Sequence, residues 1–289
     1  MLVTNGASRS RHEKASNYRY RGYRKGANHD YGSYYQPYFC TVDDRLVGVQ
    51  KVPQAKLHPS EVVTIGILFA LKGGHFRAFY RWLSRDFSAL FGGLPERSAL
   101  SRQIREQHVH TDHFLAQPSV LNVVDNYPIE LLFPIREGRS LQQVGKKGQD
   151  KGRWSIGLKL CWVINTFGQV GGWRWDTLNC ADNTFLEGLE KYDEQAIILA
   201  DWGFRCAHGL PDSVKICKKG TWNDRMTIET TFSLLTVVAH AKKIFRRAEA
   251  YIAARLTYTA AMFNVCLTLF HQLHPDESPF KVSIAEFSL

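Results

Sequence analysis

Residues 197–204 read Ile197-Ile-Leu-Ala-Asp201-Trp-Gly-Phe204, a short apolar run that ends on a carboxylate. Such a run, followed by a polar residue and a glycine, is typical of a buried strand that stops at a turn. The stretch Leu121-Asn-Val-Val-Asp125 repeats the pattern upstream. Functional groups of an open α/β sheet gather where its strands end, so we expect Asp125 and Asp201 to lie close together.

A third carboxylate follows in Trp222-Asn-Asp-Arg225-Met-Thr-Ile-Glu229-Thr-Thr-Phe232, which predicts a helix. Arg225 and Glu229 are four residues apart and share one helix face. Bringing carboxylates together at the end of a buried strand costs free energy unless a cation offsets their charge. Mg²⁺ is such a cation, because it prefers carboxylate oxygens as ligands. We therefore interpret Asp125, Asp201 and Glu229 as catalytic, metal-binding residues for Mg²⁺, with Mn²⁺ as a substitute. Arg225 would meet a phosphate or orient the glutamate.

Each of these acids also has a plainer interpretation. An aspartate after a strand is commonly a turn or N-cap residue, and a Glu–Arg pair on a helix is commonly a surface ion pair. The combination, in this order and on these expected elements, favours a metal-dependent site acting on phosphodiesters.

The composition points to a polyanionic partner. The chain has 289 residues with 37 Lys and Arg against 27 Asp and Glu, a formal net charge of +10. This balance favours DNA or RNA as a partner, although a merely basic protein has the same charge. The six cysteines form no CxxC pair, and no signal peptide or run of about 18 apolar residues is visible. We expect a cytoplasmic, nucleoid-associated protein that does not bind a membrane.

Four regions are expected along the chain. Residues 1–36 are a leader rich in Tyr, Gly and basic residues, which we expect to be disordered. Residues 37–118 are predicted to be helical and to bind DNA, 119–274 to form the catalytic domain, and 275–289 to be a tail. In the helical region, Ser60 is the expected N-cap of the first helix, Gly73-Gly74 is expected to break it, and a third helix is expected after Pro95. The arginine-bearing helices fit a helix-turn-helix unit or an ordinary helical bundle equally well.

The catalytic region alternates strands with helices. A mixed sheet flanked by helices follows from this order, with a hairpin around Phe167-Gly168. Asp182 is expected to cap a helix, and the basic loop 146–153 to contact a DNA backbone or to be merely solvated. The predicted strands are 121–124, 156–165, 169–177, 196–200 and 214–218, and the predicted helices are 183–191, 224–247 and 249–271.

These segments together resemble bacterial insertion-sequence transposases that carry an Asp-Asp-Glu triad. In that family the first Asp closes a strand, as in Val123-Val-Asp125, and the second precedes Gly and an aromatic residue, as in Leu199-Ala-Asp201-Trp-Gly-Phe204. The third lies in a Tyr-x2-Arg-x3-Glu-x6-Lys helix, which corresponds here to Trp222-x2-Arg225-x3-Glu229-x6-Thr236. Gly157-Leu-Lys-Leu160 resembles the family's hairpin, and Pro59-Ser-Glu61 with Phe76–Trp82 its helical N-terminal region.

The resemblance implies an RNase H-like fold and magnesium-dependent cleavage and strand transfer at the terminal inverted repeats of an insertion sequence. The partners would be the double-stranded DNA ends and a target, and pairing of two ends implies a homodimer. Trp222 and Thr236 depart from the family's Tyr and Lys. Lys242, Lys243, Arg246 and Arg247 offer other backbone contacts. The alternatives are a catalytically decayed DNA-binding remnant and a hydrolytic metal-dependent nuclease of the same fold.

Overall fold

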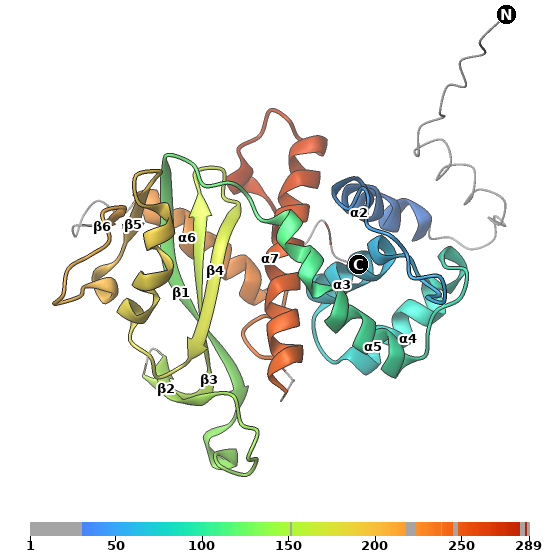
Figure 1. Cartoon of the computed structure of the whole chain (residues 1–289), viewed down its shortest axis with the longest axis horizontal. Coiled ribbons are helices and arrows are strands. Elements are labelled where there is room, and N and C mark those ends of the chain that lie inside the picture. Colours follow the sequence, from blue (N-terminus) through green and yellow to red (C-terminus); the bar gives the residue numbers. More distant parts are fainter. Residues whose placement is uncertain are drawn as a thin grey trace, which may run out of the picture.

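The computed structural model describes residues 31–150, 152–217, 223–237, 239–244, 248–283 and 287, without the side chains of 31–34, 223–227 and 237. Figure 1 shows a sheet at one side, a group of N-terminal helices at the other, and the long helix α7 between them. Most of the expected leader, residues 1–30, lies outside the described residues.

The N-terminal region is helical, as predicted. Its second described helix begins with Pro59, but the N-cap is His58 and not Ser60: the His58 side chain accepts from the Ser60 backbone, and Glu61 accepts from the His58 N–H at 2.7 Å. The leader also ends earlier than predicted, because Tyr35 is 3% exposed within the first helix. The helices are α2 (Tyr31–Arg45), α3 (Pro59–Lys72), α4 (Phe76–Asp86) and α5 (Arg97–Glu106), with 3-10 turns η2 (Ser88–Leu90) and η3 (Gln107–Phe114).

The turn between α3 and α4 follows from two glycines. Gly73 and Gly74 have φ of 67° and 71°, a left-handed conformation in which a side chain is strained. The helix axes on either side of this turn are bent by 119°. The predicted glycine break is therefore confirmed, whereas DNA binding by these helices stays a prediction.

The sheet has six strands in the order β2-β3-β1-β5-β6, with β4 also paired to β3. β3 runs antiparallel to β1, β2 and β4, while β1, β5 and β6 are parallel to one another. The strands are β1 (Leu121–Leu132), β2 (Lys146–Asp150), β3 (Arg153–Asn165), β4 (Val170–Thr177), β5 (Ile197–Ala200) and β6 (Val214–Ile216). The predicted hairpin is confirmed, and β2 is a strand that the sequence pattern did not indicate.

Three predicted details are wrong. Asp125 does not close its strand, because β1 continues to Leu132 through a long antiparallel ladder with β3. The predicted helix 183–191 is two 3-10 turns, η5 (Asp182–Gly188) and η6 (Glu190–Tyr192), and the residue at the N-cap of η5 is Ala181 rather than Asp182. Helix α6 (Asn223–Val237) ends about ten residues before the predicted end at 247, because the chain then bridges to Glu130 of β1.

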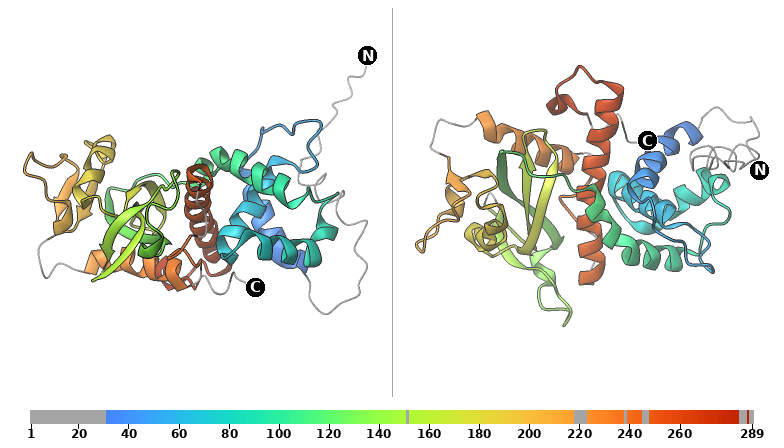
Figure 2. Two further views of the ribbon diagram at one scale, coloured as in Figure 1. Left: turned by 90° about the horizontal axis from the view of Figure 1, so that it is seen from below. Right: turned by 45° about the horizontal axis from the view of Figure 1, so that its top comes forward.

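Helix α7 (Glu249–Leu273) is the centre of the core. It packs against α2, α3, α5 and η3 on one side and β4 on the other, and Figure 2 shows it between the two groups. Such a helix is apolar on every face because every face is covered. It is long and apolar enough to cross a membrane, but 89% of its apolar window is buried inside the protein, as expected of a core helix.

One core therefore joins the helices to the sheet. Gly66 of α3 lies directly on the Tyr258 ring of α7, where a Cβ would clash, so glycine permits this close approach. On the sheet side, the buried Trp162 ring lies 5.9 Å from both Phe232 of α6 and Phe263 of α7. The boundary expected at 118/119 is thus a change of secondary structure without a break in the core.

Candidate functional site

Asp125 and Asp201 occupy matching positions on neighbouring chain segments. The parallel ladder of β1 and β5 pairs Val123 with Leu199, and two residues further along each segment lie Asp125 and Asp201. Val123 and Leu199 both pack into the core that contains α6 and α7. Since alternate residues of extended chain share a face, both aspartates belong to this same face of the sheet. The structure thus brings the two predicted aspartates together.

Asp201 begins the turn that follows β5. Its backbone is extended, and its carboxylate accepts from the Gly203 N–H at 2.9 Å, which caps the 3-10 turn η7 (Trp202–Phe204). Asp125 likewise accepts from the neighbouring Asn126 N–H at 2.7 Å. Both carboxylates are half-buried, so each is locally oriented while it keeps an accessible side.

Glu229 lies on α6, which packs on the same face of the sheet. Thr236 and Phe232 of this helix both contact Tyr127 of β1, through the hydroxyl groups at 2.6 Å and the rings at 5.2 Å. Tyr127 follows Asp125 by two residues and therefore shares its face.

The contacts advance along β1 in the order of the chain. Phe232 lies against Trp162, which pairs with Asp125, and Thr236 contacts Tyr127. Lys243, after the helix, bridges to Glu130. Glu229 precedes Thr236 by two helical turns, about 10 Å, which is about three strand residues. Counting back from Tyr127, this brings Glu229 close to the level of Asp125, between Val124 and Asp125. Glu229 is exposed, and it lies on the same flank of the helix as Thr236.

The three carboxylates lie in one region of the protein, but they are not close enough to one another to bind a single metal ion. In the part of the chain that the structure describes, no three His, Cys, Asp or Glu side chains come close enough to hold one metal ion. The donor chemistry fits Mg²⁺, because all three groups are accessible carboxylates on adjoining elements. Arg225 lies in α6 with its side chain outside the described part, and Trp222 lies outside the described residues.

A lysine and a fourth acid support the Asp201 turn. Lys159 of β3 donates to Asp182 at 2.7 Å and to the Cys180 carbonyl at 2.6 Å, with its side chain only 17% exposed. The other oxygen of Asp182 packs against Gly203, so closely that a Cβ on this glycine would clash with it. The same Cβ would lie 3.1 Å from an Asp201 oxygen. Asp182 is therefore a neighbour of the Asp201 turn and not the expected helix cap.

Two carboxylates act on the buried Cys161 thiol. Burial raises the pKa of this thiol well above its ordinary value, and the carboxylates of Asp125 and Asp182 raise it further. Cys161 pairs with Asn126 across β1 and β3. Both amide atoms of Asn126 are buried without a hydrogen-bond partner among the described residues.

Sequence analysis missed an aromatic group beside Asp201. The Trp202 ring is 57% exposed, and the Arg205 guanidinium stacks over it at 2.9 Å from the ring centroid. An exposed ring with a stacked cation is a surface on which a nucleic-acid base can stack. The signal was present as Trp202-x2-Arg205, but only the 3-10 turn brings the two side chains together.

Two of the lysines proposed to contact the DNA backbone form salt bridges with acidic side chains of the protein. Lys242 pairs with Asp150 at 2.7 Å, and Lys243 pairs with Glu130 at 2.5 Å while lying over the Phe133 ring. Both therefore tie the segment after α6 to the sheet. Arg246 and Arg247 lie outside the described residues.

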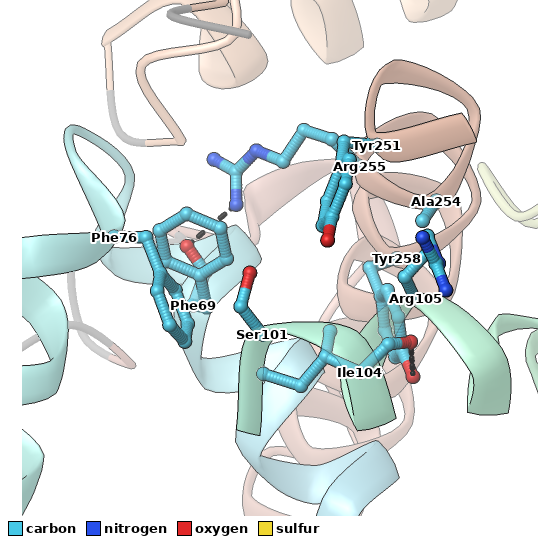
Figure 3. A pocket seen from close by; sticks show the side chains of 9 residues that line it. All are labelled: Phe69, Phe76, Ser101, Ile104, Arg105, Tyr251, Ala254, Arg255 and Tyr258. Atoms are coloured by element: carbon cyan, nitrogen blue, oxygen red, sulfur yellow. Dashed lines mark hydrogen bonds between the residues drawn. The ribbon is translucent and has the colours of Figure 1, made fainter. Parts of the chain in front are cut away.

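A small cavity between α3, α5 and α7 is structural. Figure 3 shows its lining, with Arg255 donating to the Phe69 carbonyl and Tyr258 to the Ile104 carbonyl. It offers about 20 Å³, room for a single water and far too little for a nucleotide. The carboxylates at the sheet are therefore the stronger candidate site.

Comparison with known proteins adds no relative. No model of a protein family matches the chain, and a search of the curated proteins finds no match.

Proposed function

We propose that this protein is a DNA transposase that cleaves phosphodiesters and transfers strands at the inverted-repeat ends of an insertion sequence. The observation that carries the proposal is the register of β1 and β5, which aligns Asp125 with Asp201 on the face of the sheet that α6 covers. Glu229 on α6 supplies the third carboxylate at the same level.

The sheet supports an RNase H-like assignment within this proposal. Three antiparallel strands, β4, β3 and β1, are followed by two strands parallel to β1, and the acids lie on the central strand, after its parallel neighbour and on the helix that covers them. This is the order in which an RNase H-like enzyme carries its three carboxylates. The short strand β2 and the arm before it are additions to that plan.

In this proposal, the residues of the site have three roles in phosphoryl transfer: binding the metal, positioning Asp201 and contacting DNA. Asp125, Asp201 and Glu229 would hold Mg²⁺, which when bound stabilises charge on the transferred phosphoryl group and activates the attacking oxygen. The Gly203 N–H and the Lys159–Asp182 pair keep the Asp201 turn in place. Trp202 and Arg205 present a ring and a cation to DNA next to Asp201. Two DNA ends require two such sites, so a homodimer is part of the proposal.

The decisive experiment uses DNA that carries the inverted repeats flanking the gene. The purified full chain is incubated with labelled ends and Mg²⁺ or Mn²⁺, beside Asp201→Asn and Asp125→Asn, which keep the volume of the side chain and remove its charge. We expect metal-dependent nicking at the repeat ends, at least about 100-fold weaker in each variant, with DNA binding retained. Nicking that is unchanged in both variants would overturn the assignment of the site.

A decayed, DNA-binding remnant is the second candidate. The observation that favours it is that Thr236, at the position of the family's lysine, contacts Tyr127, while Lys242 and Lys243 are paired with acids. It predicts salt-sensitive DNA binding with no cleavage in either metal. The same assay also separates a hydrolytic nuclease, which would release nicked ends but give no joined products.

A further inference from the structure

The segment between β1 and β2 forms an arm that projects from the sheet. We define the arm as residues 133–149, which are the loop 133–145 together with most of β2, and Figure 1 shows the loop extending away from the rest of the protein below β1 and β2. Nothing in the proposed chemistry requires it, because the carboxylates lie further back along β1.

The arm is held in one conformation. Gln143 accepts from the Gly138 N–H at 2.9 Å and donates to the Gly145 carbonyl at 2.9 Å, which closes the loop on itself. At its root, Lys243 pairs with Glu130 and lies over the Phe133 ring. An internally bonded loop with an anchored root is pre-organised, so binding through it costs little ordering.

Its surface is basic and apolar. The arm's sequence contains four cations and one acid, Glu137. The four cations are all exposed, and no salt bridge joins any of them to an acid among the described residues; they are Arg136, Arg139, Lys146 and Lys147. Two aliphatic side chains close to these cations in the sequence are exposed to solvent, Ile135 at 78% and Leu141 at 107% exposure. Among the described residues, these four cations therefore have no acid as a salt-bridge partner, and Lys147 lies over the Trp154 ring.

We infer that the arm binds the backbone of duplex DNA next to the catalytic site, with its cations on phosphates and its apolar tip against the groove. The inference rests on the proposed function for its partner, DNA. Asp125 on β1 and Phe133, the first residue after this strand, are eight residues apart, about 26 Å, which is less than one turn of a DNA duplex. A duplex that lies along β1 from the carboxylates therefore reaches the arm within one turn. Apolar side chains flanked by arginines suit a groove with negative potential.

The test measures the salt dependence of binding by the full chain. A fluorescein-labelled duplex of mixed sequence, about four turns long, is titrated with wild type and with Arg136→Gln/Arg139→Gln at several salt concentrations in Ca²⁺. We expect the slope of log K against log salt to fall by about two in the variant. The charge-matched control is Lys191→Gln/Lys281→Gln, two exposed lysines outside both the arm and the helical region predicted to bind DNA, which we expect to leave the slope nearly unchanged.

A crosslinking measurement tests the location directly. The photoreactive residue p-benzoylphenylalanine replaces Leu141 in one variant and Leu273, an exposed residue at the end of α7, in another. We expect a protein–DNA crosslink from position 141 and none from position 273. A crosslinked protein dimer without DNA from position 141 would overturn the inference in favour of a second copy of the chain.

The two proposals fail in different ways. If the chain nicks DNA but the arm variant keeps the wild-type slope, the arm inference is wrong and the proposed function stands. If the arm variant changes the slope but no nicking occurs, the arm inference stands and the chain is a DNA-binding remnant. If the wild type does not bind the duplex, both are wrong.

Discussion

The hydroxyl groups of Tyr127 on β1 and Thr236 on α6 lie 2.6 Å apart. Thr236 also donates to the Phe232 carbonyl at 2.9 Å, so its single proton is used there and Tyr127 is the donor of the pair. Tyr127 is 5% exposed, and burial raises its pKa. Thr236 therefore fastens α6, which also carries Glu229, to the strand that carries Asp125.

This contact predicts coupled effects on stability. Thr236→Val leaves the Tyr127 hydroxyl without its acceptor and should lower the free energy of unfolding by about 1–2 kcal/mol. Tyr127→Phe/Thr236→Val removes both partners, so we expect the double variant to lose less than the sum of the single variants. Urea unfolding of the four proteins measures the coupling, and additive losses would show that the two hydroxyl groups do not interact.

Gly203→Ala should impair catalysis more than folding. The new Cβ meets the inner oxygen of Asp182 and lies 3.1 Å from an Asp201 oxygen, so one of the two carboxylates has to move. A displacement of about 1 Å at a reacting centre costs about 100-fold in rate, and we expect a loss of nicking of this size. The control is Gly92→Ala, whose Cβ has open space. If both variants nick DNA equally well, the contact between Asp182 and Gly203 has no role in catalysis.

Arg255→Met should destabilise the core strongly. The guanidinium is 9% exposed and donates to the carbonyls of Phe69, Ala70 and Ala239 at 2.5–3.2 Å. The Phe69 carbonyl keeps the Gly73 N–H as a donor at 3.0 Å, but the carbonyls of Ala70 and Ala239 lose the buried guanidinium, so we expect a cost of about 3–5 kcal/mol.

The matched control for this variant is Arg105→Met in the same cavity. The Arg105 side chain is 33% exposed, pairs with Glu106 at 3.2 Å and lies over the Tyr251 ring. We expect it to cost less than about 1 kcal/mol. Thermal or urea unfolding compares the two, and similar losses would contradict the role given to Arg255.

Stability should fall in alkaline solution. Burial raises the pKa of Cys266 from 9.0 to about 12, and it raises the pKa of Tyr258 as well. The unfolded chain releases these protons first, so the stabilisation is complete below pH 9 and is lost as the pH rises toward 12. Each such group contributes a slope of about 1.4 kcal/mol per pH unit within this window.

The measurement is the free energy of unfolding between pH 9 and pH 10.5. In Cys266→Ala the free energy of unfolding should fall less steeply with pH, by the contribution of one group. The variant is still less stable than the wild type at every pH because packing is lost. An identical slope in Cys266→Ala and in the wild type would show that Cys266 does not titrate differently in the folded state.

Local pattern was enough to predict most of the elements. Apolar runs with β-branched residues indicated five of the strands, and the helix after Pro95, the glycine break at 73–74 and the length of α7 were predicted within a few residues. These features depend on periodicity and on turn residues, which act over a few positions. The end of β1 was wrong because its continuation depends on pairing with β3, some 30 residues away. Strand β2 was missed because Lys146-Lys-Gly-Gln-Asp150 has no apolar period, and only the neighbouring β3 makes it a strand.

The sequence alone determined which residues are proposed for the chemistry: carboxylates at 125, 201 and 229, on a strand, after a strand and on a helix, in a basic chain. Tertiary structure decided what surrounds them. The parallel register aligns Asp125 with Asp201, the Tyr127–Thr236 contact sets the level of α6, and Lys159 brings Asp182 to Gly203. These relationships join residues that are between 21 and 109 positions apart. Their geometry follows from packing and pairing across the whole core, which no local pattern encodes.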